Sequence, residues 1–241
     1  MISNRVKNYT LEEYKLDHTL LQHLKETHSH GQGSTFCYGN ASEEWENHTL
    51  WKINWLKKIS PSHIVEVGTH RGHFCYLAKL VLPEVKIRTF GDQIESAGCI
   101  EILNEYFSEE YITFTLGDSV QTFTEFDPRQ EYQLAWIDGG HQYGIVRADL
   151  ENCKRLKIEN LMVDDCGAES ITKELMGGPP VATMDFCIAS NYAVVDVSLK
   201  DLRQPWFITS RKDVPWTGPE KWPQEAPAPV FNLLNGNQTK R

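Results

Sequence analysis

Short apolar runs alternate with amphipathic runs through the middle of the chain. Seven of these runs, rich in β-branched and aromatic residues, are predicted to be strands: 63–68, 85–92, 111–118, 132–140, 160–165, 192–199 and 206–211. Helical spacing of apolar residues predicts helices between the early strands, over 73–82, 96–107, 119–126 and 143–156. This alternation indicates an α/β fold in which the first five strands form a parallel sheet built from right-handed βαβ units. A short turn near residues 200–204 joins the last two runs, so they are predicted to form an antiparallel hairpin at one edge.

The two ends of the chain differ from this middle region. Apolar spacing in the polar, histidine-rich N-terminal part predicts helices over 10–27 and 42–59. The C-terminal part holds five of the eleven prolines and two of the tryptophans, which indicates an extended tail. The expected organisation is therefore an N-terminal helical cap or lid (1–60), a sheet domain (61–211) and a C-terminal tail (212–241).

Charge and composition narrow the possible partners. The chain has 24 basic and 33 acidic residues, a formal net charge of −9. Nucleic acid and anionic membrane surfaces both favour a basic face, so neither is expected as a partner. No apolar run approaches the roughly 18 residues of a membrane span, and the N-terminus lacks the apolar core of a signal peptide. The six cysteines form no C-x-x-C pair, so a zinc ribbon is disfavoured and a cytoplasmic protein with reduced thiols is expected.

A glycine-containing loop follows the first predicted strand. The segment Glu66-Val67-Gly68-Thr69-His70-Arg71-Gly72 has the spacing acidic-x-Gly-x-x-x-Gly. Gly68 permits a tight turn close to a ligand, and Gly72 permits close packing at the helix start. A dinucleotide fingerprint needs G-x-G-x-x-G, which His70 and Arg71 interrupt. NAD and FAD are therefore disfavoured.

The glycine loop resembles motif I of the class I S-adenosylmethionine (SAM) methyltransferases, and the next two strands support that resemblance. They end in Asp92 and in Asp118-Ser119, and the carboxyl ends of parallel strands meet at one sheet edge. The resemblance implies a Rossmann-like methyltransferase sheet with helices on both faces. It also implies a SAM site in which Asp92 binds the ribose hydroxyls, the Asp118 turn lies beside the adenine, and the remaining contacts come from Glu66, Gly68, Thr69, Gly72, Ser119 and Asp138. Helix N-capping is the alternative role for Asp92 and Asp118.

The most informative segments are Asp138-Gly139-Gly140-His141 and Asp164-Asp165, each at the end of a predicted strand. If both strands are parallel, Asp138, Asp164 and Asp165 converge at one edge. Three carboxylates cannot be desolvated together without a counter-charge, so a hard divalent cation such as Mg²⁺ is expected there. His141 could then take a proton from a hydroxyl of the substrate. A helix N-cap for the Asp164-Asp165 pair and a loop hydrogen bond for His141 are the alternatives.

This pairing of D-G-x-H with D-D resembles a metal-dependent branch of the methyltransferases, the macrocin and mycinamicin type of sugar O-methyltransferases. The sequence family around that branch also includes the cephalosporin hydroxylase proteins. The resemblance spans about residues 50–211. It implies Mg²⁺ or another divalent cation on Asp138, Asp164 and Asp165, with His141 as the general base. It further implies a small-molecule hydroxyl substrate, glycan or sugar-containing, and a homo-oligomer.

Other interpretations of the same residues stay open. Catechol O-methyltransferases usually carry Asp-Asn and a lysine base where this chain has Asp164-Asp165 and His141, so the sugar class is favoured. A hydroxylase-like relative and a non-catalytic SAM-binding or interaction domain are further alternatives. Arg147 and Asp149 are expected on a solvated helix face. The three tryptophans of the second helix, Trp45, Trp51 and Trp55, are expected to form a packing face or part of a lid.

Overall fold

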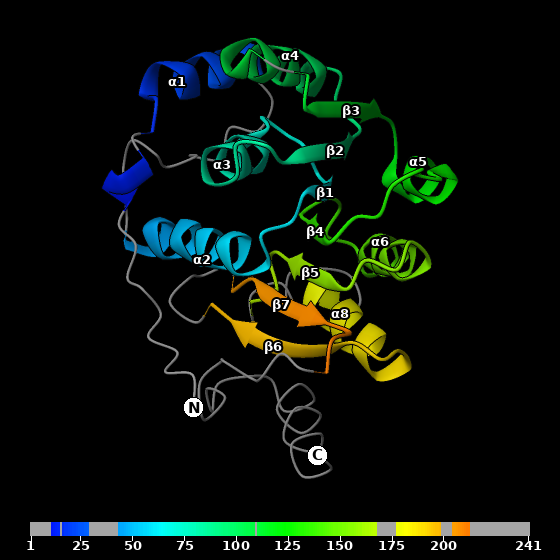
Figure 1. Ribbon diagram of the computed structural model, residues 1–241. Coiled ribbons are helices and arrows are strands. Elements are labelled where there is room, and N and C mark those ends of the chain that lie inside the picture. The colour runs from blue at the N-terminus through cyan, green and yellow to red at the C-terminus, as the bar shows by residue number, and fades with distance from the viewer. Residues whose placement is uncertain are drawn as a thin grey trace.

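A single sheet occupies the centre of the computed structural model, which describes residues 11–14, 16–28, 43–108, 110–167, 177–198 and 204–212 (Figure 1). Its strands are β1 (His63–Val67), β2 (Lys86–Gly91), β3 (Ile112–Leu116), β4 (Leu134–Ile137), β5 (Asn160–Val163), β6 (Ala193–Val197) and β7 (Trp206–Thr209). Their order is β3-β2-β1-β4-β5-β7-β6. The first five strands are parallel, whereas β7 pairs antiparallel with both β5 and β6. The expected five-stranded parallel sheet with an antiparallel hairpin at one edge is confirmed.

Helices cover both faces of this sheet. They are η1 (Leu11–Tyr14), α1 (His18–Thr27), α2 (Glu43–Ile59), α3 (His73–Val81), α4 (Glu95–Phe107), α5 (Ser119–Glu125), α6 (Tyr143–Arg155) and α8 (Gly178–Ala189). Helices α2, α3 and α4 lie on one face, with α1 packed on α4, and α5, α6 and α8 lie on the other (Figure 1). The expected α/β class with helices on both faces is confirmed.

Alternating side chains of the strands supply two cores. In β4, Ala135 and Ile137 join the cluster beneath α5, α6 and α8, whereas Leu134 and Trp136 join the cluster beneath α2 and α3. This alternation follows from the two-residue period of a strand. All four side chains are buried because a parallel sheet is covered on both faces.

The structure differs from the expected helices at two places. The predicted helix over 10–27 is interrupted, because the Asp17 carboxylate accepts hydrogen bonds from the backbone at the start of α1 and so caps a separate helix there. Helix α8 was not expected from the sequence. Its residues are apolar nearly all round and begin with Gly178-Pro179-Pro180, so they show no amphipathic period. The tail residues 213–241 lie outside the described part of the chain.

Candidate functional site

The candidate site lies where the strand order reverses direction, between β1 and β4. Chain connections leave these two strands toward opposite edges of the sheet, and ligands of open α/β sheets bind at this switch point. A cavity of about 510 Å³ opens there, lined mainly by residues at the carboxyl ends of β1, β2 and β4 and by the loop before α5. Its size is within the range of small-molecule and cofactor sites.

The glycine loop after β1 makes this cavity possible. Gly68 has a φ of +99°, and a Cβ placed on it would lie 1.9 Å from the Asp138 carbonyl oxygen. The loop and the end of β4 therefore approach more closely than any side chain would allow. Gly72 has a φ of +72° and precedes α3, where a Cβ would lie 2.7 Å from Leu103. The two glycines thus have the roles expected of them, a close turn and close helix packing.

Most of the residues predicted to bind the cofactor line this cavity. They are Glu66, Gly68, Thr69, Asp92, Asp118, Ser119 and Asp138. Gly72 is not among the lining residues and acts instead at the start of α3. The Asp118 carboxylate accepts a hydrogen bond of 2.9 Å from the backbone N–H of Val120, so the alternative role of helix N-cap is present in the same residue that lines the cavity.

Glu66 lies at the base of the cavity wall and is almost fully buried. Cys75 Sγ and Thr89 Oγ1 both donate hydrogen bonds to its Oε2. Burial raises the pKa of Glu66 to about 7, against the lowering effects of these two bonds and of the nearby Lys52 charge. Glu66 is therefore partly protonated at neutral pH.

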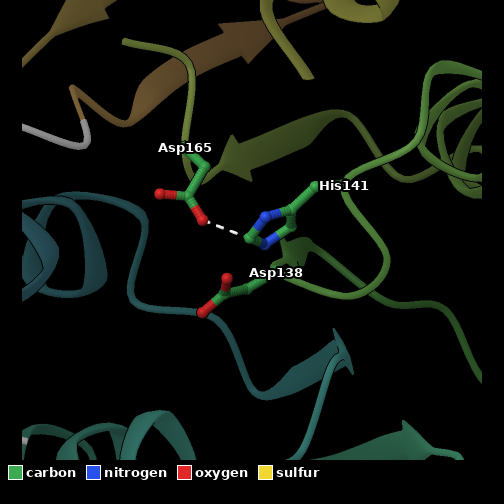
Figure 2. A group of neighbouring side chains, drawn as sticks. All are labelled: Asp138, His141 and Asp165. Atoms are coloured by element: carbon green, nitrogen blue, oxygen red, sulfur yellow. Dashed lines mark ion pairs between the residues drawn. The ribbon is translucent and has the colours of Figure 1, made fainter. Parts of the chain in front are cut away.

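Three of the predicted acid and base residues come together above the ends of β4 and β5. Asp138, His141 and Asp165 each offer a ligand atom, and these atoms all lie within 4.8 Å of one another. Figure 2 shows the two carboxylates and the imidazole directed toward one another. His141 Nε2 lies 3.0 Å from Asp165 Oδ2, and its side chain is 43% exposed. Asp165 has a φ of +51°, a left-handed turn that directs the chain after β5.

Asp164 is directed elsewhere. Its side chain is 1% exposed, and its Oδ1 lies 3.3 Å from Nε2 of the equally buried His48 on α2. Asp164 and Asp165 both follow the last residue of β5, and the left-handed backbone at Asp165 turns the chain there, so the two side chains point in different directions. The group of possible metal ligands in the described part of the chain contains two of the three predicted aspartates and, in place of Asp164, the histidine.

Helix α2 carries two buried polar residues that sequence reasoning missed, His48 beside Asp164 and Lys52 at the cavity. Beside His48, Lys52 is buried and lines the cavity, with its Nζ 3.9 Å above the centroid of the Trp136 ring. These two residues are four apart and so lie on one helix face. The sequence signal that could have identified His48 and Lys52 was their position on the apolar face of the predicted helix, where a polar residue is unusual.

The tryptophans of α2 hold the helix on the antiparallel edge of the sheet. The indole N–H groups of Trp51 and Trp55 both donate to Asp196 Oδ2 of β6, at 2.9 and 2.7 Å. The Trp55 ring also stacks on Phe207 of β7 at 3.6 Å. The expected packing role of these two side chains is confirmed, whereas the side chain of Trp45 lies outside the described part of the structure.

The prediction that Asp149 lies on a solvated helix face is wrong. Its side chain is fully buried beneath the cavity wall, and an oxygen lies 3.8 Å from the position of a Cβ on Gly139. Burial raises the pKa of Asp149 to about 7, and the nearby charge of Asp118 raises it further. Asp149 lies on the face of α6 that packs against the sheet, and the sequence alone does not identify that face. Arg147, by contrast, pairs with Glu151 one turn further along the same helix.

Comparison with known proteins identifies the domain. Residues 65–163 match a family model described as a methyltransferase domain. This segment runs from β1 to β5 and includes the glycine loop, Asp92, Asp118 and Asp138. This match confirms the expected enzyme class, a methyltransferase. The sequence matches no curated protein.

Solved structures share the fold at low sequence identity. The O-methyltransferase TomG from Streptomyces achromogenes, involved in tomaymycin synthesis and solved with SAM, has a TM-score of 0.61 and 13% identity, covering 87% of this chain and 98% of its own. An O-methyltransferase from Bacillus cereus in complex with SAH gives a TM-score of 0.59 and 13% identity, with coverages of 82% and 92%. A SAH-bound methyltransferase from Podospora anserina gives 0.58 and 14%, with coverages of 80% and 88%. The expected Rossmann-like methyltransferase fold is confirmed.

No helix among the described residues is long and apolar enough to cross a membrane.

Proposed function

We propose that this chain is a SAM-dependent O-methyltransferase that uses a divalent cation and acts on a hydroxyl of a sugar or related small molecule. The main observation behind the proposal is that the cavity and the cluster of possible cation ligands share residues. The cavity at the switch point is lined by the predicted cofactor residues, and Asp138 and His141 belong both to that cavity and to the acidic cluster with Asp165. A cofactor and a reacting hydroxyl would therefore meet at one place.

The cavity fits SAM in size and in chemistry. Gly68 allows the loop after β1 to lie directly against the backbone of Asp138, and both residues line the cavity. Asp92 follows β2 at the exposed rim, where its carboxylate can accept hydrogen bonds from two ribose hydroxyls. Three of the structurally similar proteins carry SAM or SAH in their structures. SAM, when bound, supplies an electrophilic methyl group.

The cluster above β4 and β5 fits a divalent cation. Asp138 and Asp165 provide carboxylate oxygens, the ligands that Mg²⁺ prefers, and leave positions for other oxygens. The imidazole of His141 in the same group would also suit softer divalent ions. We therefore assign Asp138 and Asp165 as the ligands, with Mg²⁺ or another divalent cation. When bound, the cation makes a hydroxyl proton easier to remove.

In this proposal His141 takes that proton. If its Nε2–H donates to Asp165 Oδ2 across the 3.0 Å separation, the neutral ring carries its basic lone pair on Nδ1. Asp165 then orients the imidazole and stabilises the imidazolium that forms, as an acid does in a catalytic triad. The ring is 43% exposed, so an incoming hydroxyl can reach it.

A sugar hydroxyl is the acceptor that the residues favour. The D-G-x-H and D-D pattern resembles the sugar O-methyltransferases, and the base at this position is a histidine, not the lysine usual in catechol enzymes. The acidic residues Glu66, Asp92, Asp118 and Asp138 line the cavity, which disfavours a phosphate backbone as the ligand there.

The test uses purified full-length protein, three readouts and three single variants. SAH binding is measured by calorimetry, Mn²⁺ binding by its electron paramagnetic resonance signal, and methyl transfer against panels of sugars, glycosides and catechols. His141→Ala should keep SAH affinity within about threefold and lose turnover by about 10²-fold or more. Asp165→Asn should weaken Mn²⁺ binding at least tenfold. Gln142→Ala, at the exposed neighbouring residue, is the matched control and should leave SAH binding, Mn²⁺ binding and turnover unchanged.

Each part of the proposal can fail separately. Full activity in excess chelator would overturn the role of the cation. Binding of SAH and Mn²⁺ without transfer to any acceptor panel would favour a non-catalytic SAM-binding domain. Transfer to catechols but not to sugars would move the enzyme to the catechol class.

A further inference from the structure

A buried lysine faces the cofactor cavity from the N-terminal part of the chain. Lys52 belongs to α2, is 7% exposed, and lines the cavity together with Glu66 and Trp136. Its Nζ lies 3.9 Å above the centroid of the Trp136 ring, a cation–π contact that fixes the ammonium against one wall. The tryptophan pair on Asp196 fixes the helix that carries it. The charge is therefore held in place before any ligand binds.

The charges around this cavity are unequally divided. Among the described residues that line it, carboxylates come from four positions, whereas Lys52 is the one lysine or arginine. His73 also lines the cavity, but burial and the positive neighbours His70, Arg71 and Lys52 keep the pKa of its imidazole well below the usual value. At neutral pH the His73 ring is uncharged. His70 and His141 also line the cavity, but an imidazole gains or loses its charge near neutral pH, so Lys52 is the one described lining residue with a permanent positive charge. The first turn of α3, which begins at His73, adds positive potential beside it.

The proposed cofactor has the complementary division of charge. SAM carries a positive sulfonium, a positive ammonium, and one carboxylate on its amino-acid tail. Acidic residues suit its cationic centres and its ribose hydroxyls, but they would repel the carboxylate. A carboxylate in a mostly acidic cavity needs a cation, and a buried charge pair of this kind is favourable only when both partners are present.

We infer that Lys52 Nζ binds the α-carboxylate of the cofactor's amino-acid tail. The inference rests on the proposed SAM-dependent function, and it assigns α2 a direct part in cofactor binding as well as in covering the sheet. The position of Lys52 agrees with this role. The two residues beside it, Glu66 and Trp136, are register partners on the neighbouring strands β1 and β4, two residues before Gly68 and Asp138. The positive charge of Lys52 is close enough to Glu66 to lower the pKa of that carboxyl.

The test compares two ligands that differ by the carboxylate alone. Calorimetry on the full chain measures SAH and S-adenosyl-3-thiopropylamine, which is SAH without its carboxylate, against the wild type and Lys52→Met. The wild type should bind SAH at least tenfold more tightly than the analogue. Lys52→Met should weaken SAH at least tenfold and leave the analogue within about threefold. The control is Lys58→Met on the exposed side of the same helix, which should shift neither ligand by more than about twofold.

Three results would overturn the inference, and one of them also overturns the proposed function. Equal weakening of both ligands in Lys52→Met, with an unchanged circular dichroism spectrum, would mean that Lys52 shapes the cavity without reading the carboxylate. If Lys52→Met does not fold, the test rests on the two ligand affinities of the wild type. A wild type that prefers SAH over the analogue by less than about threefold excludes a carboxylate contact. A wild-type chain that binds SAH without this preference refutes only the role of Lys52, whereas a chain that binds neither ligand refutes the SAM-dependent function as well.

Discussion

Replacing Gly68 by alanine tests whether the close approach of two loops defines the site. The φ of +99° is unfavourable for a residue with a Cβ, at about 1–2 kcal/mol. The new methyl group would lie 1.9 Å from the Asp138 carbonyl oxygen, whereas ordinary contact begins at 3.4 Å. The two backbones must therefore separate by about 1.5 Å (3.4 − 1.9), and overpacking of this kind costs about 1–3 kcal/mol. We expect Gly68→Ala to lower the free energy of unfolding by about 2–5 kcal/mol.

The same displacement should reach the functional cluster. Asp138 carries both the carbonyl that is pushed away and a carboxylate of the proposed cation site, so Mn²⁺ affinity should fall together with stability. Urea unfolding followed by far-UV circular dichroism measures the first effect, with the midpoint compared at a common m-value. Electron paramagnetic resonance measures the second.

Gly144→Ala is the matched control for this substitution. Gly144 lies in the first turn of α6, and no atom lies within 4 Å of the position of its Cβ. Alanine there should be neutral or stabilise the protein by up to about 1 kcal/mol, because glycine is the more flexible residue in the unfolded chain. If Gly68→Ala stays within about 0.5 kcal/mol of the wild type, the close approach does not constrain the site and the reasoning fails.

Two further predictions concern buried polar groups away from the cluster. Burial holds the pKa of Glu66 at about 7 in the folded protein, above its ordinary value of 4.5, so its contribution to stability is full below about pH 4.5 and is lost as the pH rises through 7, by up to about 3 kcal/mol. Glu66→Gln should therefore reduce the fall in unfolding free energy between pH 5 and 8. The part of the fall that remains comes from Asp149, whose pKa is raised in the same way. An unchanged pH dependence in Glu66→Gln would contradict the raised pKa of Glu66. Asp196→Leu leaves the buried indole N–H groups of Trp51 and Trp55 without their acceptor, so urea unfolding should show a loss of about 2–4 kcal/mol, with Asp196→Asn closer to the wild type. A leucine variant as stable as the wild type would mean that these two bonds do not hold α2.

Local patterns along the chain were enough to predict the sheet. Alternating apolar runs indicated the five parallel strands, and the short turn before Trp206 indicated the antiparallel hairpin. The spacing of Gly68 and Gly72 identified the loop that approaches the end of β4, since positive φ values and close contacts both require glycine. Strand ends of a parallel sheet share one edge, so the order of the strands along the chain already places the acids at these ends together.

The direction of each side chain depends instead on tertiary packing. Asp164 and Asp165 are adjacent and chemically identical in sequence, yet one is directed to His48 and the other to His141, because the chain turns at the left-handed backbone of Asp165. Asp149 is fully buried although its helix has the composition of a surface helix.

Contacts between distant segments leave no local signal in the sequence either. Lys52 lies on a helix that precedes the first strand, and only the docking of α2 on Asp196 brings its charge into the cavity. Local patterns specify which elements form, because periodicity and turn geometry act over a few residues. The charge balance of a cavity depends on which faces of those elements meet, and that is fixed by packing across the whole chain.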